Sequence, residues 1–90
     1  MKLRVIGTNQ QVLEFKDGTR ILFSYESPVA AFVPNEGYEK TERFISRTSE
    51  KHAAKWIGKE TCKTVSQEQL AQRLNDRVGI HGAEAGDTAL

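Results

Sequence analysis

This chain of 90 residues has little cysteine, a small net charge and no long apolar run, and each of these features excludes a class of protein. A single cysteine, Cys62, permits no disulfide within the chain, which is typical of proteins from a reducing compartment. The net charge is only +1, so the chain as a whole has no strong electrostatic attraction to nucleic acid or to membranes. No apolar run approaches the roughly 18 residues of a membrane-spanning helix. The run after Lys2 and Arg4 is also too short for a signal peptide.

Groups suited to catalysis or metal binding are few. Cys62 and His52 are a conceivable nucleophile and base, but a lone cysteine is more often a small, partly buried apolar residue. The other histidine, His81, falls in an aperiodic stretch. A zinc site takes about four ligands at defined spacing, and a phosphate-binding loop takes clustered glycines; the sequence shows neither pattern. We therefore expect a protein that is not an enzyme and that uses no metal or cofactor.

The residues that are abundant describe an ordinary globular domain. Hydrophobic residues make up 38% of the chain and charged residues 28%, a balance that argues against general disorder. The length fits one domain, which we place at residues 1–80. Residues 81–90 have no periodicity, so we expect a flexible C-terminal tail there.

Short apolar segments in the first half predict a small antiparallel sheet of three to five strands within residues 2–45. The candidate strands are 2–6, 11–15, 19–25, 29–33 and 38–45, and Pro28 and Pro34 bracket the fourth. A three-residue loop that ends at Gly18 places Leu13 opposite Ile21. One face of this hairpin then carries Leu13, Phe15, Ile21, Phe23 and Tyr25. Farther along, Phe44 and Ile45 indicate that the last segment reaches the core.

Two helices are predicted in the second half of the chain. Thr48 or Ser49 can cap the first, which covers residues 50–57 and ends at Gly58. Residues 59–65 are compatible with either a loop or a short strand. A capping box at Ser66–Gln69 begins the second helix, whose apolar positions and C-cap are Leu70, Leu74, Val78 and Gly79.

These elements together predict an α+β fold in which both helices pack on one face of the sheet. The sheet would contribute Leu13, Phe15, Ile21 and Phe23, and the helices would contribute Trp56, Ile57, Leu70 and Leu74.

The positive charge is concentrated in the middle of the chain, where residues 38–65 hold seven basic and four acidic side chains. Basic residues recur there every four positions, which is close to one helical turn. Hydroxyl residues fall at the predicted helix start, where free backbone N–H groups attract phosphate or carboxylate. The candidate phosphate-binding residues are Arg47, Thr48, Ser49, Lys51, His52, Lys55 and Lys59. The alternatives are plain helix capping for the hydroxyls and a solvated helix face for the bases.

Three aromatic residues are candidates for an interface. Trp56, beside Lys55, can stack on a base or anchor a protein partner if it is exposed, but its spacing from Ala53 favours a place in the core. Tyr25 and Tyr38 flank the proline-bracketed strand and can rim a groove or pack at its edge.

A run of residues resembles a family of small proteins of unknown function that are encoded mostly by bacteriophages. The resemblance covers about residues 12–57 and is carried by Ser24-Tyr25, the segment 28–34, Gly37-Tyr38, Lys40-Thr41, Ser46, Thr48-Ser49, Lys51-His52 and Lys55-Trp56. Asn35 stands where the family would have glycine, and Ala53-Ala54 stand where it would have isoleucine and a polar residue. The resemblance implies a phage protein in the cytoplasm of a bacterial host cell, and it implies no activity.

The leading hypothesis is a small binding module that contacts phosphate groups, above all those of nucleic acid, through the basic helix start. The alternative is a module that binds a host bacterial protein through the sheet edge or the proline-bracketed strand. A further alternative is an accessory structural or assembly protein that acts as a homo-oligomer.

Overall fold

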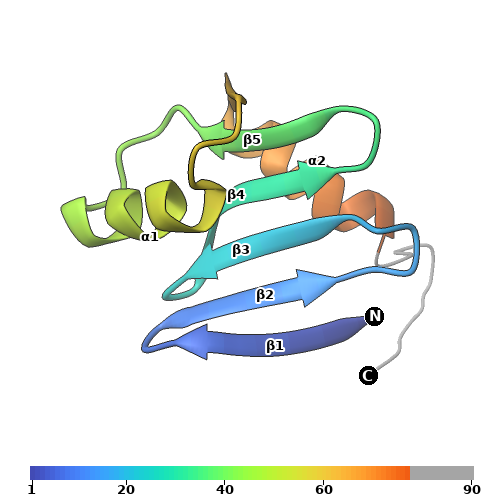
Figure 1. Cartoon of the computed structure of the whole chain (residues 1–90), viewed down its shortest axis with the longest axis horizontal. Coiled ribbons are helices and arrows are strands. Elements are labelled where there is room, and N and C mark those ends of the chain that lie inside the picture. Colours follow the sequence, from blue (N-terminus) through green and yellow to red (C-terminus); the bar gives the residue numbers. More distant parts are fainter. Residues whose placement is uncertain (78–90) are drawn as a thin grey trace.

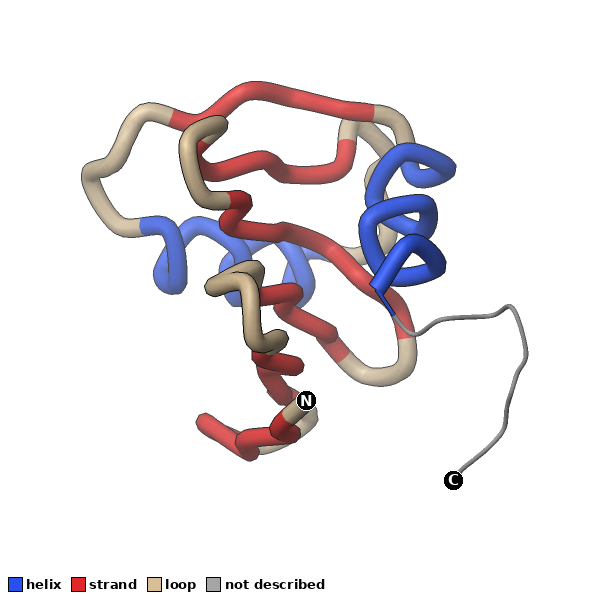
Figure 2. Tube along the Cα trace, turned by 90° about the vertical axis from the view of Figure 1, so that its right-hand side faces the viewer, coloured by secondary structure: helices blue, strands red, loops and turns tan. Residues whose placement is uncertain are grey.

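A sheet of six strands runs through the molecule in sequence order, and one helix lies on each of its faces (Figures 1 and 2). The computed structural model describes residues 1–77. Within them the elements are β1 (Lys2–Gly7), β2 (Gln10–Glu14), β3 (Arg20–Ser24), β4 (Ser27–Val33), β5 (Gly37–Thr41), α1 (Arg47–Ile57), β6 (Cys62–Val65) and α2 (Gln67–Arg77). The predicted α+β class is confirmed. The sheet has one strand more than the three to five expected. The additional strand, β6, forms within residues 59–65, for which the sequence was compatible with either a loop or a strand.

The first five strands form an antiparallel meander, and β6 lies parallel to β5. Parallel neighbours need a crossover that leaves the sheet, and α1 provides it between β5 and β6. The pairing therefore places α1 over one face. The chain returns from β6 at the sheet edge and runs as α2 over the other face (Figure 1).

The β2–β3 hairpin has the predicted register, with Leu13 opposite Ile21. The Phe15 N–H donates to the carbonyl oxygen of Thr19 at 2.9 Å, and the Gly18 N–H donates to that of Phe15 at 3.0 Å. Gly18 has φ of +95°, a conformation that glycine adopts without the steric cost of a side chain. Leu13 and Ile21 thereby share one face, while the Glu14–Arg20 pair lies on the other face together with Val12 and Leu22.

The prediction that both helices pack on one face is wrong. Beneath α1 lie Val12, Leu22, Val29 and Ala30, in contact with Ala53 and Ile57. Beneath α2 lie Phe15, Ile21 and Ala31, with Leu13 and Phe23 at the margin and Leu70 in the centre. Adjacent residues of the central strands are buried on opposite sides, so both faces need a cover. Trp56 and Ile57 accordingly meet the face opposite to Leu13 and Phe15.

Three local predictions also need correction. Helix α1 begins at Arg47, and its cap is Ser46, whose Oγ accepts the Ser49 N–H at 3.0 Å. Strand β5 ends at Thr41, so Phe44 lies on the surface with 65% of its area exposed, while Ile45 packs against the core. Tyr25 leaves the strand face and enters the turn after β3.

The predicted end of α1 at Gly58 and the predicted start of α2 at Ser66 are confirmed. Gly58 closes α1 with φ of +69°, and its N–H donates to the carbonyl oxygen of Ala54 at 2.9 Å. Ser66 caps α2, because its Oγ accepts the Gln69 N–H at 3.1 Å. The predicted contact of Val78, the C-cap at Gly79 and the tail at 81–90 lie outside the described residues.

Candidate functional site

The outer surface of α1 carries the basic stripe. Ala53 and Ile57 face the sheet, so the opposite side of the helix is exposed to solvent. Arg47, Lys51 and Lys55 follow one another along that exposed side at steps of four residues. Lys59 is exposed just beyond the end of the helix.

The cations of this region have no acidic partners among residues 1–77. The salt bridges that the described residues form belong to Arg4, Lys63, Arg73 and Arg77. None involves the six cations between residues 40 and 59, which are Lys40, Arg43, Arg47, Lys51, Lys55 and Lys59. Three exposed carboxylates, Glu42, Glu50 and Glu60, lie in the same stretch, so an excess of positive charge remains.

A chain of buried hydroxyl groups lies beneath the start of α1. The Ser46 hydroxyl donates to Ser49 Oγ at 3.1 Å, and Ser49 Oγ lies 2.8 Å from Ser24 Oγ. Ser24 Oγ also lies 2.8 Å from Nδ1 of His52. Ser24 and Ser49 are both buried. Ser49 is therefore engaged in joining α1 to β3 and has little surface of its own to offer a ligand.

The hydrogen bonds around Ser24 favour one tautomer of neutral His52. Each hydroxyl has one proton to donate. Ser49 accepts the proton of Ser46, which leaves its own proton for Ser24, and all three hydroxyl groups donate when Ser24 in turn donates to Nδ1 of His52. In this arrangement the ring proton lies on Nε2, on the side of the ring away from Ser24.

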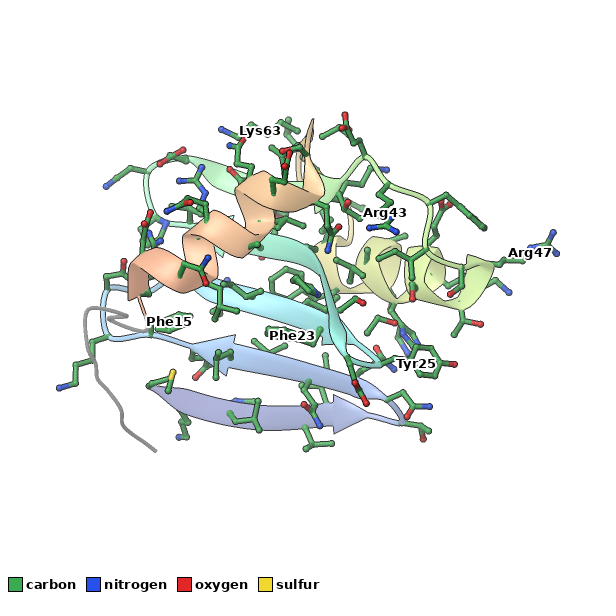
Figure 3. All side chains as sticks on the ribbon, turned by 180° about the vertical axis from the view of Figure 1, so that it is seen from behind. Phe15, Phe23, Tyr25, Arg43, Arg47 and Lys63 are labelled. Atoms are coloured by element: carbon green, nitrogen blue, oxygen red, sulfur yellow. The ribbon has the colours of Figure 1, made fainter. Side chains whose placement is uncertain are left out.

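The aromatic candidates have different surroundings. Trp56 and Tyr38 pack edge to face with centroids 5.5 Å apart, and both contact the core beneath α1. The Arg20 guanidinium covers the neighbouring Phe32 ring at 4.7 Å. Tyr25, in contrast, has 51% of its area exposed and lies beside the His52 ring. Figure 3 shows Tyr25, Arg43 and Arg47 at the same end of the molecule, around the start of α1.

A hollow of about 370 Å³ lies between α1 and the end of β5. Its charged lining consists of Lys40, Arg43, Glu42 and Glu50, two of each sign. Because these charges balance, the hollow itself has no preference for an anion. Phosphate recognition is better served by the outer surface of α1.

Cys62 and His52 do not gain catalytic features from the fold. Burial raises the pKa of the Cys62 thiol, which keeps it protonated at neutral pH and lowers its reactivity. Among residues 1–77, no group of three His, Cys, Asp or Glu side chains could hold a metal ion. Within the same range, neither helix is long and apolar enough to cross a membrane.

Fold and site together define a small α+β domain whose distinctive surface is a helix with cations that form no salt bridge within residues 1–77. The chain belongs to a family of unknown function, DUF8033, whose model matches residues 1–72. No curated protein and no solved structure matches the chain.

Sequence reasoning found the basic stripe, but it missed the role of Ser24, gave the cap of α1 to Thr48 or Ser49 rather than Ser46, and placed Phe44 at the core. A serine at the end of an apolar strand gives no sign of a partner 25 residues away. Ser46 precedes two further hydroxyl residues that are equally good caps by sequence. The exposure of Phe44 follows from the early end of β5, which the apolar pair Phe44-Ile45 concealed.

Proposed function

We propose that this protein is a small non-enzymatic binding module that contacts the phosphate groups of nucleic acid through the outer surface of α1. Arg47, Lys51 and Lys55 make the central contacts, with Arg43 and Lys59 at the two ends. The observation that carries this proposal is the lack of acidic partners for these cations among the described residues. Like charges one turn apart repel each other by a few tenths of a kcal/mol per pair, and a polyanion relieves that repulsion.

The site differs from the one expected at the helix start. Ser46 Oγ accepts a hydrogen bond from the Ser49 N–H, and the Ser46 carbonyl oxygen accepts one from the Glu50 N–H. The Ser49 side chain is buried. Glu50 also puts a carboxylate in the first turn of the helix. Side-chain charge along α1, rather than the free backbone groups of its first turn, is therefore the source of attraction. Thr48 and His52 can add hydrogen bonds at the margin.

Binding of this kind is weak and depends strongly on salt. About three to five phosphate contacts give a slope of roughly −2 to −4.5 in a plot of log affinity against log salt concentration, with the shallower values for single strands. A phage protein in the cytoplasm of a bacterial host, as the resemblance over residues 12–57 implies, would meet nucleic acid of both host and phage.

Reversing two charges on α1 tests the proposal. The double substitution Lys51→Glu and Lys55→Glu should weaken binding of a short oligonucleotide at low salt by at least about tenfold, because two phosphate contacts become repulsive. Fluorescence anisotropy measures the affinity, and proton–nitrogen NMR of the wild type should show shifts clustered on residues 43–59.

The matched control changes the net charge equally but elsewhere. Lys2 and Lys16 are exposed and, within residues 1–77, form no salt bridge. Lys2→Glu with Lys16→Glu should therefore retain most of the affinity. Equal losses in the two double variants would mean that only net charge matters, and a wild type that binds no oligonucleotide at low salt would end the proposal.

A second candidate function, binding of a host protein, is favoured by the free edge at β1. Among the described strands β1 pairs only with β2, and its Leu3 and Val5 side chains are 57% and 69% exposed. Figure 3 shows that α2 leaves β1 and β2 uncovered. An apolar edge of this kind accepts an added strand. The proline-bracketed strand does not serve this purpose, because β4 is paired on both sides.

Lysine at two positions tests this candidate. Leu3→Lys with Val5→Lys should abolish capture of a bacterial protein from host lysate, because charge on the strand opposes pairing and removes apolar contact. Capture that persists in this variant would exclude β1 as the interface. Light scattering that shows a dimer of the wild type, but not of the variant, would identify the partner as a second copy, as the homo-oligomer hypothesis requires.

A further inference from the structure

The conformation of Tyr25 is costly and is not explained by packing. Tyr25 and Glu26 form the two-residue turn between the paired residues Ser24 and Ser27. Of these two residues only Tyr25 has a positive φ, which is +59°. A positive φ at the first central position alone is the pattern of a type II′ turn, and that position favours glycine. A side chain in this conformation costs on the order of 1 kcal/mol or more. With 51% of Tyr25 exposed, burial offsets little of that cost.

The ring of Tyr25 lies beside a histidine held in one orientation. The Tyr25 and His52 rings have centroids 6.4 Å apart and planes inclined by 34°. Ser24, the residue before Tyr25, donates to Nδ1 of His52, so the turn and the imidazole share one buried anchor. The result is an anchored imidazole beside an exposed aromatic ring, and within residues 1–77 only Nδ1 of the imidazole forms a hydrogen bond.

This pair borders the basic stripe. Lys55 follows His52 by three residues, so the two side chains are neighbours on the helix surface. Tyr25 and Arg47 lie at the same end of the molecule in Figure 3. A strand whose phosphates follow α1 would bring its bases close to the two rings.

We propose that Tyr25 and His52 form a stacking site for one base of single-stranded nucleic acid, with Nε2–H of His52 as a donor to the base or its phosphate. This inference rests on the proposed function and specifies its ligand. A base in a duplex is covered on both faces by its neighbours, whereas a base in a single strand can stack on an exposed aromatic ring. Single strands should therefore bind more tightly than duplexes of the same length.

Glycine at position 25 separates a binding role from a structural one. Tyr25→Gly removes the ring and suits the positive φ, so the variant should be at least as stable as the wild type to heat. Its affinity for a single-stranded oligonucleotide should nevertheless fall about tenfold, the effect expected for the loss of one stacked base. Tyr25→Phe keeps the ring and should retain the affinity.

An abasic strand of the same length provides the matched ligand. It carries the same phosphates but no bases, so the wild type should bind it about tenfold more weakly than the normal strand. The wild type and Tyr25→Gly should bind the abasic strand with the same affinity, because neither can stack a base on it. Anisotropy at low salt measures all four affinities. If Tyr25→Gly binds the normal strand like the wild type, the stacking site is refuted while salt-dependent phosphate binding stands. If the wild type binds neither strand, both proposals fall together.

Discussion

Replacing Arg73 with alanine should lower the free energy of unfolding by about 3 kcal/mol, because it leaves a buried carboxylate without its main partner. Glu39 lies on the β5 face beneath α2 and is fully buried. Arg73 on α2 reaches it with two hydrogen bonds, of 3.2 Å and 2.6 Å, and bonds Glu36 as well at 2.9 Å. These carboxylates raise the pKa of Arg73, with the hydrogen bonds to Glu39 as the largest contribution. A loss of this size is a large share of the stability of a small domain.

Urea denaturation followed by circular dichroism measures the effect of Arg73→Ala. The double substitution Glu39→Met with Arg73→Met removes both charges and should recover most of the loss, since apolar pairs often replace buried ion pairs without cost. Lys63→Ala is the control, because Lys63 Nζ is 3.6 Å from Glu39 and half exposed, and it should cost less than about 1 kcal/mol. Arg73→Ala and Lys63→Ala with equal effects would show that the buried contact does not hold α2 to the sheet.

Ser24→Ala should lower the free energy of unfolding by about 2 kcal/mol. The change removes the partner of the buried Ser49 hydroxyl and of Nδ1 of the half-buried His52. Buried polar groups left without a partner cost about 1 to 3 kcal/mol, whereas the lost volume is small. Ser27→Ala lies at the other end of the same turn and is the matched control, with an expected effect within about 0.5 kcal/mol.

Nitrogen NMR of the His52 ring gives an independent check on the hydroxyl chain. In the neutral ring of the wild type, the proton should reside on Nε2 if Ser24 donates to Nδ1. In Ser24→Ala that preference should weaken, since Nδ1 has lost its donor. A wild-type ring with its proton on Nδ1 would reverse the assigned chain of donors and remove the free Nε2–H from the stacking site.

Features encoded by a few neighbouring residues were predictable from the sequence. The loop ending at Gly18 fixes the register of β2 and β3 through backbone conformation alone, and the caps at Gly58 and Ser66 act within one helical turn. The α1 stripe likewise follows from helical spacing. Each of these features depends on contacts close in sequence.

Features that depend on distant contacts were not predictable. Strand β6 has four residues, of which Lys63 and Thr64 are exposed, so it carries no alternation that would mark it as a strand. The burial of both Ile21 and Leu22 indicates two covered faces, but only the path through β6 decides which helix covers which. Ser46, Thr48 and Ser49 are locally equivalent as caps, and the contact between Ser49 and Ser24 separates them.

The unequal distribution of ion pairs between the two helices makes the part of the molecule formed by residues 1–77 electrically asymmetric. Around α2, Arg73 and Arg77 are neutralised by Glu36, Glu39 and Asp17, while the cations of α1 stay uncompensated within the described chain. A body with such a dipole is turned by the field of a polyanion before it makes contact, although its net charge is only +1. For the proposed binding to nucleic acid, the near-neutral composition would therefore hide an oriented approach, in which α1 leads and the rest of the sheet follows behind it.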